Sequence, residues 1–154
     1  MNTTDIGWMN EALCLAEKAK EMGEVPVGAV IVKEGRVIGS AHNLREKNGM
    51  ATAHAELLAI EEACKALGGW RLTDCTLYVT LEPCPMCTGA ILNARISRVV
   101  YGAKDPVAGC CGSVVNLNIY PFNHSFSLTG GVCEEPCRKL LQDFFENKRK
   151  DGNS

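Results

Sequence analysis

The chain has 154 residues, of which 46% are hydrophobic and 22% are charged, and its formal net charge at pH 7 is −2. This length and composition are ordinary for a single soluble globular domain over residues 1–154, and the net charge argues against a protein that is basic throughout and coats nucleic acid nonspecifically. A local basic patch is still compatible with RNA binding, and its candidates, which solvated helix faces also explain, are Arg95, Arg98, Lys104, Arg138, Lys139, Lys148, Arg149 and Lys150.

Helical and strand patterns alternate along the chain. Asp5 is expected to cap a first helix, in which apolar residues recur at helical spacing until Gly23 ends it. Glu34-Gly35 predicts the turn of a hairpin. The order of elements favours a three-layer α/β/α sandwich around a mixed five-stranded sheet. The predicted elements are helix 5–22, strand 27–32, a returning strand from 37, a polar loop 43–51, helix 53–67, strand 76–80, helix 85–94, strand 98–101, a long loop 105–124 with a short helical piece, a weak strand 125–128 and helix 135–150.

Nothing in the sequence indicates a targeting or membrane segment. The first five residues contain no basic run followed by an apolar core, and no apolar stretch approaches the roughly 20 residues that span a membrane. We therefore expect a cytoplasmic protein without membrane contact, in which thiols stay reduced. Its nine cysteines cannot all pair because nine is odd, so metal-binding or core roles are expected rather than a disulfide framework.

Two short motifs lie at predicted helix starts and predict a metal site. They read T-A-H-A-E at residues 52–56 and E-P-C-P-M-C at residues 82–87. The C-x-x-C spacing lets Cys84 and Cys87 face one ion, and His54 supplies a third ligand. Catalytic zinc usually has three such ligands and one open position for water. A helix N-terminus also lowers the pKa of a cysteine toward the thiolate that zinc binds.

Glu56 is the candidate proton carrier of this site. It lies two residues beyond His54, which is too close to share its helical direction, but near the first turn it can lean over the metal. We expect Glu56 to take a proton from zinc-bound water, to pass it to a ring nitrogen and later to protonate the leaving ammonia.

Less specific interpretations of the same residues stay open at this point. A C-x-x-C alone is often a structural zinc knuckle or a redox pair, and a structural site needs a fourth ligand. Cysteines elsewhere could provide that ligand, or a second metal site at Cys133 and Cys137, although core packing or incidental thiols are favoured for all of them. These other cysteines are Cys14, Cys64, Cys75, Cys110, Cys111, Cys133 and Cys137.

The H-A-E and P-C-x-x-C motifs together are the signature of zinc-dependent deaminases. Residues 24–30, 77–84 and 98–105 resemble those of bacterial tRNA-specific adenosine deaminases, and the resemblance extends from the first helix to Phe144-Phe145. It implies a cytidine-deaminase-like fold, a homodimer with one zinc ion per subunit, and a tRNA anticodon stem-loop as partner. The implied reaction is hydrolytic deamination of the wobble adenosine to inosine.

The resemblance also assigns roles to individual residues. It places zinc on His54, Cys84 and Cys87, and the proton shuttle on Glu56. It implies that Asn43 hydrogen-bonds the flipped base and that the backbone of Ala55 meets the base edge. Asp105 would border the nucleic-acid channel, where its carboxylate could accept from a ribose 2′-hydroxyl that DNA lacks. Alternatively, Asn43 ends a strand as a turn residue, and Asp105 forms a turn with Pro106.

Three functions are compared on these grounds. The leading one is a tRNA adenosine deaminase. A second is a deaminase of a free base or nucleoside such as cytosine, cytidine or guanine, which the metal motif alone does not distinguish. A third is a non-catalytic zinc module that binds RNA or protein, and Glu56 argues against it because a structural site has no use for that carboxylate. Residues 146–150 read E-N-K-R-K, whereas the family often has a cluster of arginines here. How strongly the last helix binds RNA therefore stays open.

Overall fold

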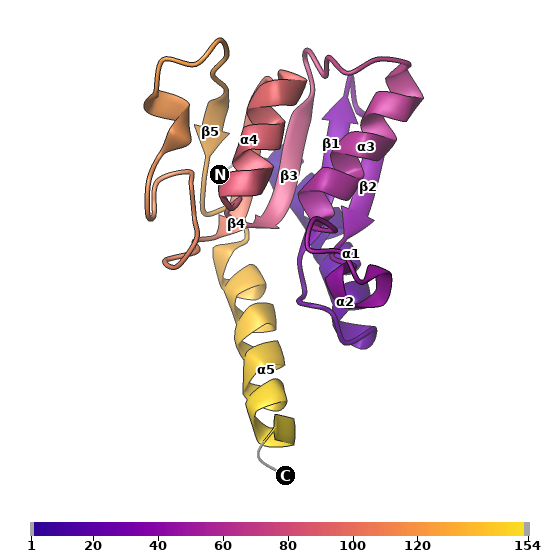
Figure 1. Cartoon of the computed structure of the whole chain (residues 1–154), viewed down its shortest axis with the longest axis vertical. Coiled ribbons are helices and arrows are strands. Elements are labelled where there is room, and N and C mark those ends of the chain that lie inside the picture. The colour runs from indigo at the N-terminus through magenta and orange to yellow at the C-terminus, as the bar shows by residue number, and fades with distance from the viewer. Residues whose placement is uncertain (1, 153–154) are drawn as a thin grey trace.

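The computed structural model describes residues 2–152, and its elements follow the predicted order with one addition (Figure 1). The last strand begins two residues later than predicted, and the addition is a short helix in the predicted polar loop 43–51. The elements are α1 (Thr3–Glu21), β1 (Gly28–Lys33), β2 (Arg36–His42), α2 (Arg45–Asn48), α3 (Ala55–Leu67), β3 (Thr76–Leu81), α4 (Pro85–Ala94), β4 (Arg98–Ala103), the 3₁₀ turn η1 (Leu117–Ile119), β5 (Ser127–Thr129) and α5 (Glu134–Gly152).

The five strands form one mixed sheet in the order β2-β1-β3-β4-β5, which confirms the predicted sheet. β1 runs antiparallel to both β2 and β3, whereas β3, β4 and β5 are parallel. The β1–β2 hairpin turns at Glu34 and Gly35, both of which have positive φ (51° and 73°), as the twist of a tight hairpin requires. Within residues 2–152, no helix combines the length and hydrophobicity that a membrane crossing needs.

Helices cover both faces of the sheet, so the predicted three-layer α/β/α arrangement is confirmed. α3 and α4 lie on one face, and α1 and α5 lie on the other (Figure 1). Alternate residues of each central strand enter two separate cores, because side chains of a strand point to opposite faces in turn. Leu77 and Val79 of β3 pack with α3 and α4, whereas Tyr78 between them packs with α1.

Two glycines bring helices unusually close to the sheet. A Cβ atom at Gly28 would collide with the backbone of Ala12 in α1, and one at Gly39 would collide with the backbone of Ala59 in α3. Glycine is the residue that permits such an approach. The contact at Gly39 fixes the position of α3 on β2, and thereby the position of His54 at the start of that helix.

The start of α1 differs from the prediction. Asn2, and not Asp5, caps the helix, because its side chain accepts a hydrogen bond from the Thr4 N–H at 2.8 Å. Asp5 is buried instead and accepts two hydrogen bonds from Arg98, at 2.8 and 2.7 Å, and one from the Tyr78 hydroxyl at 3.0 Å. The bond from Arg98 lowers the pKa of Asp5 although burial opposes it. The Arg98 side chain is 30% exposed but is bound to Asp5, so we remove it from the candidates for a basic patch.

Helix α2 was missed because a distant residue stabilises it. Its N-cap residue Leu44 makes no side-chain capping bond. The buried carboxylate of Glu24 accepts from the Glu46 N–H at 3.0 Å and from the Lys47 N–H at 2.8 Å. A contact across more than twenty residues therefore closes this turn, and local sequence patterns do not report such a contact.

Candidate active site

The three predicted metal ligands meet at the N-terminal ends of two helices. His54 is the N-cap residue of α3, Cys84 is the N-cap residue of α4, and Cys87 lies in the first turn of α4. The Nδ1 atom of His54 lies 3.7 Å from Sγ of Cys84 and 3.5 Å from Sγ of Cys87. All three donor atoms lie within 4.8 Å of one another, so one metal ion at their centre could contact all of them.

The local sequence explains why Cys84 and Cys87 converge. β3 delivers the chain to Cys84 in extended conformation, and Pro85 occupies the first helical position, where its missing N–H costs no hydrogen bond. The hydrogen bond with Cys87 lowers the pKa of Cys84 to about 4, against the effect of burial. The same bond and burial raise the pKa of Cys87. A coordinated cation deprotonates thiols outright and would hold both as thiolates.

Glu56 lies beside the thiols with its carboxyl group fully enclosed. The residue is 3% exposed, and its Oε1 atom is buried without a hydrogen-bond partner among the described residues. Burial raises the pKa of Glu56 to about 7. A carboxyl group with this pKa gains and loses a proton easily at neutral pH, as a general acid and base must. Glu56 also lines the pocket, so a group that enters the pocket comes close to this carboxyl group.

The donor set fits a metal ion with three protein ligands and an open position. Within the described chain, no other cysteine joins these three donors, and Cys133 and Cys137 do not form a second group of three possible ligands. The structure therefore gives no support to a fourth cysteine ligand or to a second site there. Burial raises the pKa of four other thiols. These are Cys110 and Cys111 in the loop after β4, and Cys133 and Cys137 beside the core on the α1 side of the sheet.

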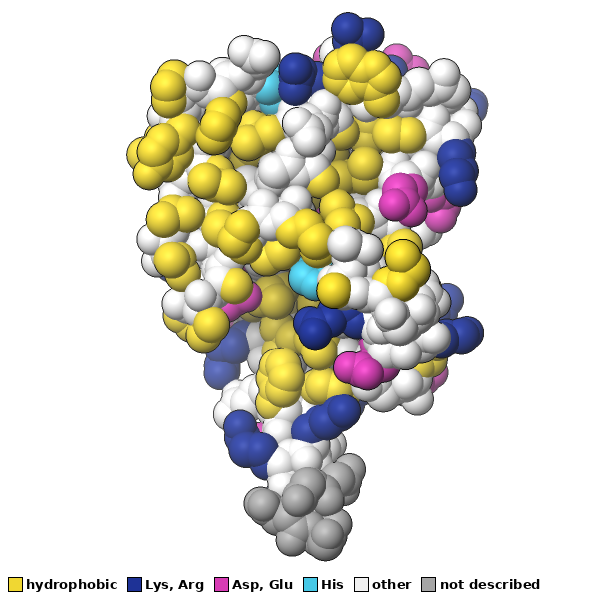
Figure 2. Space-filling model, viewed as in Figure 1, with side chains coloured by type: hydrophobic (Ala, Val, Ile, Leu, Met, Phe, Trp, Pro, Cys, Tyr) yellow, Lys and Arg dark blue, Asp and Glu magenta, His cyan; other side chains and the backbone are white. Residues whose placement is uncertain are grey.

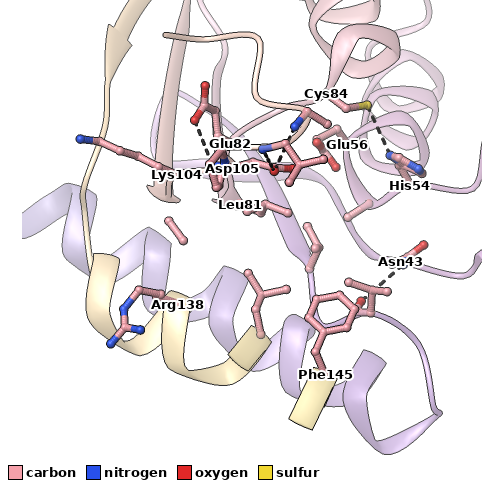
Figure 3. Close-up of a pocket in the computed structure, with 18 of the residues that line it drawn as sticks. Asn43, His54, Glu56, Leu81, Glu82, Cys84, Lys104, Asp105, Arg138 and Phe145 are labelled. Atoms are coloured by element: carbon pink, nitrogen blue, oxygen red, sulfur yellow. Dashed lines mark hydrogen bonds between the residues drawn. The ribbon is translucent and has the colours of Figure 1, made fainter. Parts of the chain in front are cut away.

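A pocket of about 570 Å³ opens over this group (Figure 3). Its volume lies in the range of small-molecule and cofactor sites. Cys87 lies behind the pocket wall and is fully buried. The other six predicted site residues line the pocket: Asn43, His54, Ala55, Glu56, Cys84 and Asp105.

Asn43 and Ala55 offer polar groups to the pocket. The Asn43 side chain is 6% exposed; its Oδ1 atom accepts from the Arg45 N–H at 3.2 Å, and its Nδ2 atom donates to the Val25 carbonyl at 3.4 Å. An amide has two donor hydrogens and two acceptor lone pairs, so each end keeps capacity for one more bond. Ala55 is the first residue of α3, and a first-turn N–H has no partner within its own helix.

Asp105 follows β4, and it is both a turn residue and a residue of the pocket wall. Its Oδ1 atom accepts from the N–H groups of Val107 at 3.0 Å and Ala108 at 3.1 Å, so it does form a turn. The same side chain lies in the pocket wall, on the side opposite Asn43 (Figure 3).

Helix α5 forms a wall of the pocket that the sequence did not predict. Arg138, Leu141 and Phe145 line the cavity, more than 50 residues after the last metal ligand. Phe145 is 44% exposed at the pocket, whereas its neighbour Phe144 is buried. The only local signal was the repeated apolar pattern of α5, which does not tell a pocket wall from a core. The Arg138 guanidinium is held by Glu135 at 2.8 Å and by Gln142 at 3.0 Å.

Comparisons with known proteins agree with this geometry. A family model described as MafB19-like deaminase matches residues 3–149. A tRNA-specific adenosine deaminase of Bacillus subtilis (strain 168) is 54% identical, over 96% of this chain and 92% of that protein. This chain belongs to the tRNA-specific adenosine deaminase family. A solved structure from a study of A-to-I editing by tRNA:A34 deaminases matches this family member with a TM-score of 0.84 and 45% identity, over 86% of this chain and 97% of that chain.

The fold also extends to another deaminase specificity. A guanine deaminase from Bacillus subtilis matches this tRNA-specific adenosine deaminase family member with 44% identity and a TM-score of 0.62, over 68% of this chain and 66% of that chain. The match covers less of both chains than the matches to the tRNA-specific enzymes. The predicted cytidine-deaminase-like fold class is thus confirmed. The same fold also occurs in a protein that is named for deamination of a free base, guanine.

Proposed function

We propose that this chain catalyses hydrolytic deamination of adenosine to inosine at the wobble position of a tRNA anticodon, with zinc as its cofactor. The observation that carries the proposal is the enclosed Glu56 carboxyl group beside His54, Cys84 and Cys87, in a chain similar over nearly its whole length to a tRNA-specific adenosine deaminase. One imidazole nitrogen and two sulfurs are ligands that zinc prefers.

The reaction replaces the exocyclic amino group of adenine with oxygen from water. Zinc, when bound by the three ligands, supplies a water molecule of lowered pKa as nucleophile. Glu56 takes the proton of this water and delivers it to a ring nitrogen, while the water oxygen forms a bond to C6. Glu56 then carries the second proton to the amino group, the bond from C6 to that nitrogen breaks, and ammonia leaves. A pKa of about 7 allows Glu56 to work in both directions.

The pocket walls supply the groups that hold the base. We assign Asn43 to the polar edge of the flipped base, because its amide retains one donor and one acceptor. Ala55 lines the same pocket, and its N–H at the helix start could donate to an acceptor of the base. Flipping the base out of its strand is what brings it to such a pocket.

The substrate is tested by ammonia release from four compounds. The zinc-loaded protein is expected to deaminate an anticodon stem-loop containing the wobble adenosine, and to leave free adenosine, cytidine and guanine unchanged. Affinity for the stem-loop should fall as salt rises, because phosphate contacts release counterions. Turnover of guanine or cytidine without turnover of the RNA would assign the chain to the free-base or nucleoside deaminases, and the likeness to a guanine deaminase is the observation that favours this alternative. A protein that binds zinc and RNA but releases no ammonia would be a non-catalytic module.

Asp105 is proposed to favour RNA over DNA. Its carboxylate lies in the pocket wall and can accept from a 2′-hydroxyl, whereas a DNA backbone offers it only repulsion. Asp105 is half-buried and its Oδ1 atom already accepts from Val107 and Ala108, so Oδ2 is the acceptor left for a 2′-hydroxyl. An unpaired, buried acceptor costs about 1–3 kcal/mol, or roughly 5- to 150-fold in relative rate, and a half-buried one lies toward the lower end of that range. In Asp105→Asn the ratio of RNA to DNA turnover, measured on matched hairpins, should fall by about tenfold, mainly through faster DNA turnover. An unchanged ratio would leave Asp105 only its turn with Val107 and Ala108.

We further propose a homodimer formed through the surface of α4 and the segment 113–122. Within α4, Ile91 and Leu92 are buried in the core of their own chain and are not available for contact with a second subunit. Figure 2 shows hydrophobic side chains gathered on this face. The exposed hydrophobic residues of the segment, all at least 40% exposed, are Val114, Val115, Ile119, Tyr120 and Phe122.

A charge placed on this surface should therefore separate the subunits. Ile119→Asp is expected to yield monomers in light scattering, because Ile119 is 75% exposed and fills no core. Val37→Asp is a matched control, since Val37 is exposed on β2 and lies outside the surface. A parent protein that is monomeric and fully active would exclude the dimer.

Two further proposals concern the domain organisation and the cellular location of the protein. We propose that residues 1–154 act as one deaminase domain. We also propose a cytoplasmic location, where tRNA is available and where the nine free cysteines stay reduced.

A further inference from the structure

Two buried carboxylates outside the proposed catalytic set each hold a segment at the rim of the pocket. Glu24 and Glu82 are both 1% exposed. Neither forms a salt bridge with a described residue; both accept hydrogen bonds from backbone N–H groups instead. Buried carboxylates are costly unless such bonds satisfy them. Their partners therefore indicate what the two residues do.

Glu82 accepts hydrogen bonds from several backbone N–H groups of the loop 105–113. Its Oε1 atom accepts from the Asp105 N–H at 3.0 Å, and its Oε2 atom accepts from the N–H groups of Cys111 and Ser113, both at 3.0 Å. The Ser113 hydroxyl donates to the same carboxylate. Figure 3 shows Glu82 beside Asp105, below the metal ligand Cys84. One carboxylate thus holds the loop at both of its ends.

The fit between this loop and Glu82 is close. A Cβ atom at Gly109 would collide with the carboxyl carbon of Glu82, so glycine lets the loop pass over the carboxylate. The Cys110 N–H also donates to the Pro83 carbonyl at 2.9 Å. The loop is therefore attached to the two residues that directly precede Cys84, and its other side lines the pocket through Asp105, Val107 and Ala108.

Glu24 holds the backbone at the opposite rim of the pocket in the same way. Its two oxygens accept from the N–H groups of Glu46 and Lys47, the orphan donors at the start of α2. Arg45, which directly precedes Glu46, and Asn43, two residues before Arg45, line the pocket at this rim. Asn43 and Asp105 lie on different sides of the pocket (Figure 3).

We propose that Glu24 and Glu82 are positioning residues that preform the two rims of the RNA-binding pocket before RNA arrives. The proposal rests on the proposed function for the identity of the ligand. Neither carboxylate needs to touch substrate, because each acts through the backbone it holds. A preformed rim reduces the conformational entropy that binding must overcome, so loss of either carboxylate should weaken RNA binding more than the chemical step.

The test uses Glu24→Gln and Glu82→Gln in the zinc-loaded protein. Glutamine keeps the size of the side chain but turns an NH₂ group toward N–H donors. Amide hydrogen exchange should accelerate by about tenfold or more at residues 46 and 47 in Glu24→Gln only, and at residues 105, 111 and 113 in Glu82→Gln only. Each variant is therefore the control for the other. Exchange that is unchanged, or accelerated equally at both rims, would overturn the proposal.

Kinetics separate positioning from mere support of the fold. KM for the stem-loop should rise by about tenfold in each variant while kcat and zinc content change far less. A fall in kcat together with zinc loss, at unchanged KM, would show that the carboxylates support the metal centre instead. If Glu82→Gln does not fold, Ser113→Ala removes one of its donors and should accelerate exchange at residue 113. A parent enzyme inactive on RNA would contradict the proposed function, and the exchange pattern would still decide whether the carboxylates hold the rims.

Discussion

Replacement of Glu56 by alanine is expected to lower turnover of the stem-loop by about 10²–10⁴-fold or more, the usual contribution of a positioned acid and base. Zinc should remain bound at the parent level, because Glu56 is not among the three ligands. Single-turnover kinetics, with the metal content of the same sample measured by mass spectrometry, report both quantities. The two results together distinguish a proton carrier from a ligand.

Glu56→Gln is the matched control for the loss of side-chain volume. Glutamine fills the same enclosed space but cannot accept and return a proton at neutral pH. We expect it to be as inactive as the alanine variant. Zinc-free Glu56→Ala protein, or normal turnover by either variant, would show that the role assigned to Glu56 is wrong.

Replacement of Cys87 by alanine should remove the metal together with the activity. Cys87 is fully buried behind the pocket wall, and among the described residues no cysteine except Cys84 shares its donor group. Two remaining ligands fall short of the three that catalytic zinc usually has. After dialysis, zinc content should fall from about one ion per chain to near zero, with turnover at background.

Cys75→Ala provides a control for the buried sulfur itself. Cys75 is also fully buried, but it belongs to the hydrophobic core and not to the donor group. It should lose a comparable amount of packing, keep its zinc and retain its turnover. Full zinc occupancy in Cys87→Ala would remove this residue from the ligand set.

The sequence predicted the parts of this protein that short-range patterns encode. The convergence of the candidate metal donors was predictable because C-x-x-C and a helix start place Cys84 and Cys87 together regardless of the rest of the chain. The central strands were predictable because unbroken apolar segments suit a sheet that is covered on both faces. In each case, neighbouring residues contain the information.

The missed features depend on contacts between distant segments. Asp5 was assigned as a helix cap because the sequence does not show that Arg98 lies opposite it, 93 residues later. α2 was assigned as a loop because Glu24 closes it from another part of the chain. The exposure of Phe145 depends on where α5 crosses the pocket. These outcomes follow from tertiary packing, which competes with local preference and overrides it.

The α5 wall of the pocket has a consequence for the timing of biosynthesis. The three candidate metal donors lie within the first 87 residues, whereas Arg138, Leu141 and Phe145 are added about 50 residues later. A domain generally folds as a unit during synthesis. A chain that lacks α5 therefore contains the candidate donors but not this wall of the pocket, so the pocket is complete only once synthesis of the chain is nearly finished.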